Sequence, residues 1–185
     1  MGELFNKAIE IVIKYHDGQI RKITGLPVIF HLFDAACIAS SLTDDEEVWS
    51  AVLLHDILEI TTYTASQLLE DFGPKVHQYV LSHTEEKIDE LSRVIYWNVR
   101  KETSIMKMSS SPIQEKILVL CAELSNLRAL YKDFLVLKDK VWERFTIKNS
   151  SDHKWYYSSV LQKLYEFKDT YPYVEYKRLV YLIWS

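Results

Sequence analysis

Hydrophobic residues recur every three to four positions along most of the chain, which is the spacing of amphipathic α-helices. The first segment carries them at Leu4, Phe5, Ala8, Ile11, Val12 and Tyr15. Gly18 follows this pattern, and a glycine can cap the C-terminus of a helix. Similar patterns predict further helices over about 28–42, 47–58, 65–73, 74–83, 91–106 and 112–130. The last third of the chain also has a helical pattern, with a loop near 149–152.

Short polar motifs mark the starts of several of these helices. Pro27 disfavours helix at the residue before it, so the second helix is expected to begin after this proline. The stretch 43–46 (Thr-Asp-Asp-Glu) offers an N-cap followed by acidic residues. Thr64 and Gln67 have the spacing of a capping box. The sequence therefore predicts an all-α bundle of roughly eight to ten helices, in a single domain over residues 1–185.

The composition agrees with a helical protein and limits the classes of binding partner that we expect. Only four glycines and four prolines occur, fewer than β-sandwiches and glycine-rich nucleotide-binding folds need for their turns. The formal net charge of −4 gives no broad basic surface, so we expect no DNA partner. No apolar run approaches the roughly 18 residues of a membrane span, and the N-terminus does not resemble a signal peptide. We expect a cytoplasmic protein with no membrane partner, in which Cys37 and Cys121 are buried free thiols.

The candidate chemistry centres on a His-Asp pair inside an apolar helical pattern. His55 and Asp56 are adjacent, and a further histidine, His31, belongs to the preceding helix. A buried carboxylate loses its hydration, and a divalent cation held between the helices would offset that cost. The alternative is a core histidine bonded to a backbone carbonyl, with Asp56 in a salt bridge. Spacing alone leaves both interpretations open.

One more acidic residue lies close to this pair. Glu59 follows His55 by four positions, so in a continuous helix the two share a face. A carboxylate there can orient a water molecule or take its proton; alternatively, Glu59 is a solvated residue at a helix end. His77 and His83 have no partners at ligand spacing, and we expect them to be structural or exposed. His153 lies in a polar, loop-like stretch and is expected to be exposed.

Taken together, these residues resemble the HD hydrolase domain of the RelA/SpoT-type (p)ppGpp hydrolases and their small stand-alone relatives. The matching segments are His16-Asp17-Gly18-Gln19-x-Arg21-Lys22-x-Thr24-Gly25-x-Pro27-x-x-x-His31, His55-Asp56-x-x-Glu59-x-Thr61, Phe72-Gly73-x-x-Val76 and Leu124-Ser125-Asn126-Leu127-Arg128. The resemblance extends from residue 4 to about residue 180.

The resemblance implies an all-α fold with one divalent ion, typically Mn²⁺, held by two histidines and two aspartates. The implied activity is removal of the 3′-pyrophosphate from a guanine nucleotide, ppGpp or pppGpp. Three implied metal ligands match, namely His31, His55 and Asp56, and Glu59 matches the first of two acids that position the attacking water. The implied substrate-binding residues are Arg21, Lys22, Asn126 and Arg128. Cationic side chains suit a substrate with dense negative charge.

The sequence also departs from the family at two acidic positions. Ala122 stands where the family has its second ligand aspartate, and Ile60 replaces the second acid of the catalytic pair. The neighbouring Glu123 lies about 100° around a helix from Ala122, so it cannot replace the aspartate without a local shift. The loss of two acids affects both the binding of an ion and the chemistry beside it.

Three hypotheses follow from these matches and departures. The first is an active metal-dependent hydrolase in which Glu123 or a water molecule fills the fourth ligand position. The second is a catalytically degenerate HD protein that binds a nucleotide or a protein partner without hydrolysis. The third is a structural, all-helical interaction protein that has kept the His-Asp pair as a relic.

Overall fold

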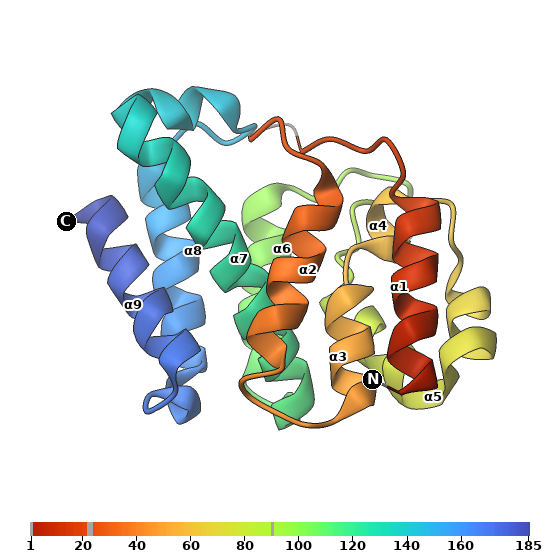
Figure 1. Ribbon diagram of the computed structural model, residues 1–185. Helices are drawn as coiled ribbons and strands as arrows, with labels where there is room; N and C mark the ends of the chain where they lie inside the picture. Colours follow the sequence, from red (N-terminus) through yellow and green to blue (C-terminus); the bar gives the residue numbers. More distant parts are fainter. Residues whose placement is uncertain (1, 22–23, 90) are drawn as a thin grey trace. The chain divides into compact units, whose positions relative to one another are not determined.

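The computed structural model describes residues 2–21, 24–89 and 91–185. These residues form nine α-helices and two short 3-10 helices, and within them no strand occurs beyond two isolated bridges, Ile20 with Pro27 and Ile88 with Val94. In chain order the elements are α1 (Glu3–Tyr15), α2 (Val28–Ala39), α3 (Glu46–Leu53), α4 (Ile57–Ile60), α5 (Ala65–His83), α6 (Trp97–Met108), α7 (Ile113–Leu137), η1 (Lys138–Arg144), α8 (Ser150–Lys163), η2 (Tyr165–Phe167) and α9 (Tyr171–Trp184) (Figure 1). The prediction of an all-α bundle is therefore confirmed.

The contacts divide the chain into two compact units. Unit 1 comprises Met1–Arg21, Gly25–Thr84 and Pro112–Ser125, and unit 2 comprises the rest. The first half of helix α7 belongs to unit 1 and the second half belongs to unit 2. A single domain over the whole chain stays a prediction.

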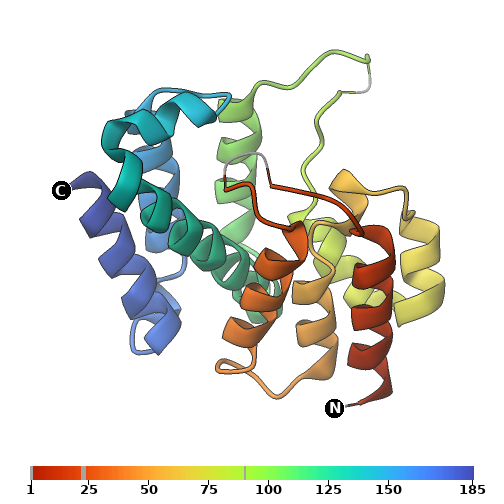
Figure 2. The same cartoon turned by 45° about the horizontal axis from the view of Figure 1, so that its top comes forward.

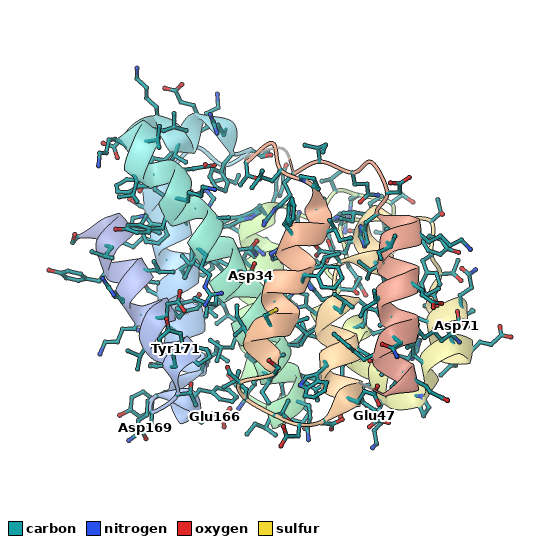
Figure 3. All side chains as sticks on the ribbon, in the orientation of Figure 1. Asp34, Glu47, Asp71, Glu166, Asp169 and Tyr171 are labelled. Atoms are coloured by element: carbon teal, nitrogen blue, oxygen red, sulfur yellow. The ribbon has the colours of Figure 1, made fainter. Side chains whose placement is uncertain are left out.

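In unit 1, the short helix α3 packs against three longer helices, α1, α2 and α5 (Figures 1 and 2). Ala51, Val52 and Leu53 of α3 have no exposed surface, so this helix lies at the centre of the unit 1 core. Two ion pairs bind α5 to its neighbours at the surface, Lys7 with Asp71 and Lys75 with Glu47, each 2.7 Å long. Figure 3 labels both acids.

The expected helix starts are confirmed in unit 1. The Thr64 side chain accepts a hydrogen bond from Gln67 N, and the Gln67 side chain accepts one from Thr64 N, which makes the expected capping box. The Asp45 side chain accepts a hydrogen bond from Glu47 N at the start of α3. Gly73 has a φ of 77° and kinks α5, which fits the two successive helices that the sequence predicted there.

The helix predicted over 47–58 is wrong in one respect that matters for function. α3 ends at Leu53, a turn contains His55 and Asp56, and α4 begins at Ile57. No glycine or proline marks this break, and the hydrophobic pattern continues through it. The sequence therefore gives no local signal that the helix ends here. The His-Asp pair therefore lies in a turn between two helices, and the shared helical face expected for His55 and Glu59 does not exist.

Unit 2 has an aromatic core in which α8 packs against α6 and α9. The ring of Trp142 stacks on the rings of Trp184 and His153, with centroids 5.5 and 5.3 Å away. The loop expected near 149–152 and the exposure expected for His153 are wrong. Asn149 caps α8, whose first turn begins at Ser150, and His153 is buried with its Nε2 bonded to the carbonyl of Ile147.

The two cysteines differ from each other. Cys121 is buried as expected, whereas Cys37 is exposed because it lies on the outer side of α2. Among the described residues, no helix combines the length and the apolar character that a membrane crossing requires.

Candidate metal centre

Three side chains from two parts of unit 1 converge on one point. His31 lies in the first turns of α2, and His55 and Asp56 lie in the turn between α3 and α4. One possible ligand atom from each residue lies within 4.8 Å of the others. Both histidines are buried, and the Asp56 side chain is 29% exposed. The structure thus brings together the three ligands expected from the sequence, and it presents a possible metal site.

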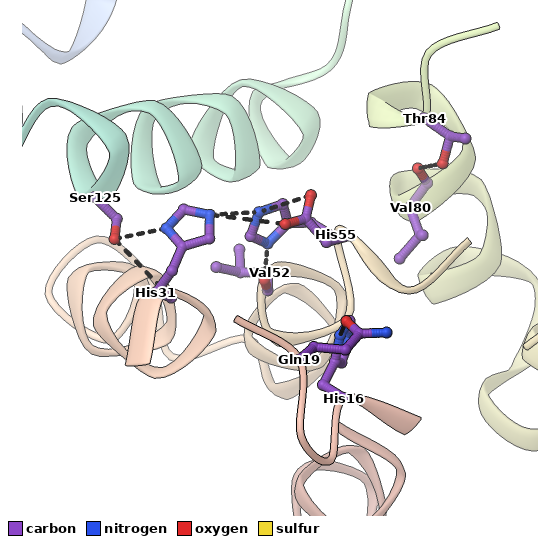
Figure 4. Close-up of polar contacts among 9 residues, drawn as sticks. His16, Gln19, His31, Val52, His55, Val80, Thr84 and Ser125 are labelled. Atoms are coloured by element: carbon purple, nitrogen blue, oxygen red, sulfur yellow. Dashed lines mark hydrogen bonds and ion pairs between the residues drawn. The ribbon is translucent and has the colours of Figure 1, made fainter. Parts of the chain in front are cut away.

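The ring of His55 is oriented by a backbone carbonyl. Its Nδ1 lies 2.7 Å from the carbonyl oxygen of Val52, and a carbonyl only accepts hydrogen bonds (Figure 4). Nδ1 therefore carries the proton, and in the neutral ring Nε2 presents a lone pair toward His31 and Asp56.

The ring of His31 is oriented by a side chain from α7. Ser125 Oγ donates to the His31 carbonyl oxygen at 3.3 Å and lies 2.8 Å from His31 Nδ1 (Figure 4). A hydroxyl has one proton to donate, so the short contact is a bond from Nδ1–H to Ser125 Oγ. His31 Nε2 is then a lone-pair donor as well.

The two bare nitrogens face each other across a short distance. The two Nε2 atoms lie 3.1 Å apart, and they lie 3.9 Å (His31) and 3.5 Å (His55) from the Asp56 carboxylate. Two lone pairs beside a carboxylate, with no proton between them, repel one another. Two imidazole nitrogens and a carboxylate oxygen are a donor set that suits a divalent transition-metal ion, so the residues present fit such a group.

The charges in the cluster favour the protonation states that a metal requires. Burial lowers the pKa of His31 well below 6.5, and the nearby His55 and Arg21 lower it further. Burial acts to raise the pKa of Asp56, but the neighbouring His55, His31, His83 and Arg21 outweigh it and lower that pKa to about 2. A neutral imidazole beside an ionised carboxylate is the ligand state of these groups.

The positions of the two missing acids differ in their surroundings. Ala122 is buried in α7, three residues before Ser125, and Ile60 is 42% exposed at the end of α4. Glu123 is buried too, but among the described residues it does not join the group of ligand atoms. Among the described residues, no second carboxylate therefore stands in that group, where the family resemblance implies an aspartate.

The other expected site residues are placed as follows. Glu59 is half-buried in the one-turn helix α4, outside the group of ligand atoms, and its role stays a prediction. Arg21 lies in the loop before α2, and its charge acts on both His31 and Asp56. Lys22 lies outside the described residues. Its role as a substrate-binding residue stays a prediction.

Asn126 and Arg128 belong to unit 2 in the second half of α7. Arg128 forms a two-pronged ion pair with Glu175 of α9, through Nε at 2.8 Å and Nη2 at 2.6 Å. This pair gives the guanidinium a structural partner that the sequence did not indicate. The nucleotide contacts expected of Asn126 and Arg128 remain predictions.

Three residues near the cluster were not identified as site residues from the sequence. Ser125 belongs to a quoted motif, but its bond to His31 joins positions 94 residues apart. The ring of His83 lies 5.3 Å from the ring of His55, so His83 adjoins the cluster without ligand spacing in the sequence. His16 is buried, and its electrostatic neighbours include Asp56 and His55. The only signal for His16 and Ser125 was their place in motifs that the family shares.

Comparisons with known proteins agree with this geometry. The HD domain family matches residues 8–140. A Mycobacterium leprae protein named probable GTP pyrophosphokinase is 30% identical over 130 residues, which are 69% of this chain and 16% of that protein. A Haemophilus influenzae protein named guanosine-3′,5′-bis(diphosphate) 3′-pyrophosphohydrolase is 45% identical over 65 residues, 35% of this chain and 10% of that protein. The chain thus spans less than a fifth of the length of these curated relatives.

Two solved structures share the fold over most of the chain. The Listeria monocytogenes protein lmo0812 aligns with a TM-score of 0.73 and 28% identity, covering 88% of this chain and 99% of its own. A metazoan ortholog of SpoT, described as hydrolysing ppGpp, aligns with a TM-score of 0.78 and 21% identity, covering 98% of this chain and 96% of its own. With the family match over most of the chain and the His-His-Asp cluster in place, the chain belongs to the HD domain family.

Proposed function

We propose that this chain is a divalent-cation-dependent hydrolase that removes the 3′-pyrophosphate from ppGpp or pppGpp, with Mn²⁺ as the ion. The products are pyrophosphate and GDP or GTP. Because the substrate is a nucleotide, we propose the cytoplasm as its location. The observation that carries the proposal is the pair of bare Nε2 atoms of His31 and His55, 3.1 Å apart beside Asp56.

Some of the expected site residues would bind the cation, and others would bind the substrate. His31, His55 and Asp56 would hold the cation, which when bound polarises a phosphoryl oxygen and lowers the pKa of a water molecule. Glu59 would orient the attacking water from α4, as its counterpart does in the family that the sequence resembles. Arg21 and Lys22 would neutralise phosphate charge.

The family resemblance implies two further nucleotide-binding residues, both in the second half of α7. Asn126 would bind the nucleotide through its amide group, and Arg128 through the guanidinium that also binds Glu175. The names of the relatives support a guanine nucleotide as the substrate, since the Haemophilus influenzae relative is named for guanosine-3′,5′-bis(diphosphate).

A second function is favoured by one specific observation. Ala122 is buried at the position of the family's fourth ligand, and Ile60 offers no acid beside Glu59. An HD protein with these losses would bind a nucleotide or a protein partner and not hydrolyse it. Retention of the three ligands together with Arg21 and Arg128 is compatible with such a binding module.

One experiment on a single preparation separates the two functions. The protein is purified with Mn²⁺, and its bound metal, its binding of ppGpp and its release of pyrophosphate from ppGpp are all measured. We expect close to one Mn²⁺ per chain together with turnover, and we expect His55→Ala to lose both. His77→Ala, which removes an imidazole outside the cluster, serves as the matched control. Bound Mn²⁺ and bound ppGpp without turnover would establish the binding module, and a chain that binds no Mn²⁺ would contradict the hydrolase.

A further inference from the structure

His16 is a buried histidine with an unusual hydrogen-bonding state. It follows the last residue of α1, and its side chain is nearly inaccessible to solvent, since the residue is 3% exposed. Figure 4 shows this side chain extending from the end of α1 toward the turn that carries His55. None of the roles described above involves His16.

The position of the proton on the His16 ring follows from its neighbours. Gln19 Nε2 donates to the carbonyl oxygen of Ile60 at 2.9 Å, which fixes the orientation of the Gln19 amide. Gln19 Oε1 therefore faces His16 Nδ1, 2.9 Å away, and because this oxygen only accepts, Nδ1 carries the proton. Burial, the largest influence, lowers the pKa of His16, so the ring is neutral and its Nε2 is a bare acceptor.

Within the described part of the chain, this Nε2 is buried and has no hydrogen-bond partner. The other buried imidazoles near it, His31 and His55, have their Nδ1 atoms bonded to Ser125 and Val52, and their Nε2 atoms face each other in the candidate metal centre. A buried acceptor without a donor destabilises the folded state, and in a native protein a bound water or ion is one explanation for such an atom.

The surroundings of this nitrogen indicate what it binds. Asp56 and His55, two of the three ligands in the cluster, act electrostatically on His16. Through Gln19, His16 is also linked to the backbone of Ile60, the position at which the family's second catalytic acid is missing. His16 thus offers an acceptor in the region where this chain lacks the oxygen atoms of one carboxylate.

We propose that His16 is a positioning residue of the cation site, whose Nε2 accepts a hydrogen bond from a water molecule held beside His55 and Asp56. This inference rests on the cation-dependent part of the proposed function. It assigns to His16 the orientation of solvent at a centre that has lost the carboxylates of positions 60 and 122. His16 is not itself a ligand, because it does not belong to the group of ligand atoms.

Two substitutions of His16 test the roles of the two ring nitrogens one at a time. In His16→Asn the side-chain amide reaches only the place of Nδ1, so it can keep the contact with Gln19 and lacks an acceptor at the place of Nε2. In His16→Gln the amide reaches the place of Nε2 and loses the contact with Gln19. A purely structural role predicts that Asn replaces His16 better than Gln, and the proposed role predicts the opposite.

The test measures the affinity of the intact chain for Mn²⁺ alone by calorimetry, without nucleotide, and thermal unfolding with and without Mn²⁺. Residues that support metal ligands from outside typically contribute 10–100-fold to metal affinity. We expect His16→Asn to bind Mn²⁺ about 10–100-fold more weakly than the native chain, and His16→Gln to lie within a few-fold of it. His77→Asn is the control for loss of an imidazole elsewhere in unit 1.

A variant that does not fold is recognised from its thermal unfolding without metal, and His16→Phe then replaces it, because a ring of similar size fills the space without an acceptor. Equal Mn²⁺ affinities of the native chain and of His16→Asn or His16→Phe would overturn the inference while leaving the proposed function intact. If the native chain binds no Mn²⁺, both the inference and the cation-dependent hydrolase are overturned.

Discussion

His31 and His55 present their Nε2 atoms to each other at 3.1 Å, and each ring is held in this orientation through its Nδ1. Val52 holds His55 through a backbone carbonyl, which no substitution of a side chain removes. Ser125 holds His31 through a hydroxyl, which a substitution does remove. The two halves of the cluster can therefore be tested separately.

Ser125→Ala should weaken metal binding without unfolding the chain. The substitution removes the acceptor for His31 Nδ1–H, so the ring can rotate or change tautomer and its lone pair is no longer fixed. We expect Mn²⁺ affinity to fall about 10–100-fold and stability without metal to fall by about 1 kcal/mol. Calorimetry and thermal unfolding measure the two effects. Ser41→Ala removes a hydroxyl that bonds the Ile38 carbonyl in the same unit, and it should leave the affinity unchanged. An unchanged affinity in Ser125→Ala would show that the hydroxyl does not orient the ligand.

Most of the fold could be predicted from local signals. The apolar periodicity gave the helices, and the capping box of Thr64 and Gln67 and the kink at Gly73 were visible in the residue types. The break between α3 and α4 was not predictable in this way, because an apolar turn and an apolar helix have the same hydrophobic pattern. That break is set by tertiary packing, which buries Leu54 and Ile57 on both sides of the His-Asp pair.

The ligands of the candidate site could be predicted from the sequence, but the hydrogen bonds that orient these ligands could not. The His-Asp pair and His31 could be found from the cost of a buried carboxylate and from the family motifs. The bonds that orient them join residues far apart in the chain, such as His31 with Ser125, and periodicity carries no information on such pairs. The same reason explains why His153, in a polar sequence, is buried under the aromatic rings of unit 2.

Acid should destabilise the metal-free protein in two stages. The pKa of His31 is lowered in the folded chain, so as pH falls below about 6.5 the unfolded chain takes up a proton there that the folded chain does not, and the free energy of unfolding falls. Asp56 acts at lower pH. The pKa of Asp56 is about 2 in the folded chain, below its ordinary 3.8. Asp56 therefore contributes to the free energy of unfolding above pH 3.8, and this contribution is lost as pH falls through about 2. The contribution amounts to at most about 2 kcal/mol.

The first stage can be measured by thermal unfolding of the metal-free chain between pH 7.5 and 5, a range set by the ordinary pKa of histidine, about 6.5. We expect a shallower loss of stability in His31→Gln than in the native chain, because the variant has no imidazole to titrate at this position. An identical slope in His31→Gln would contradict the assignment of this stage to His31.

The ion pair between Arg128 and Glu175 allows the predicted nucleotide contact to be distinguished from a structural role. Both guanidinium bonds are short, and the two side chains are 32% and 19% exposed. We expect Arg128→Gln and Glu175→Gln each to lower the free energy of unfolding by about 1 kcal/mol. A nucleotide contact further predicts that KM for ppGpp rises in Arg128→Gln alone. If KM stays unchanged in both variants, Arg128 stabilises α7 against α9 and does not bind the substrate.

The most informative substitution restores the missing ligand at position 122. Ala122 is buried, so Ala122→Asp places a carboxylate where it has little contact with water, and without metal we expect a loss of about 3 kcal/mol. Mn²⁺ should offset this loss, because the new carboxylate would then coordinate the ion with His31, His55 and Asp56. Thermal unfolding with and without Mn²⁺ measures the difference.

A second buried alanine of unit 1 provides the control for this restoration. Ala8 in α1 is also inaccessible to solvent, and Ala8→Asp should be destabilised to a similar degree with no recovery in Mn²⁺. If Ala122→Asp recovers and Ala8→Asp does not, position 122 faces the cation. Combining Ala122→Asp with Ile60→Asp should then raise pyrophosphate release from ppGpp above that of the native chain, since both missing acids are restored. Recovery of stability without any gain in turnover would instead support the binding module, in which the loss of hydrolysis involves more than these two positions.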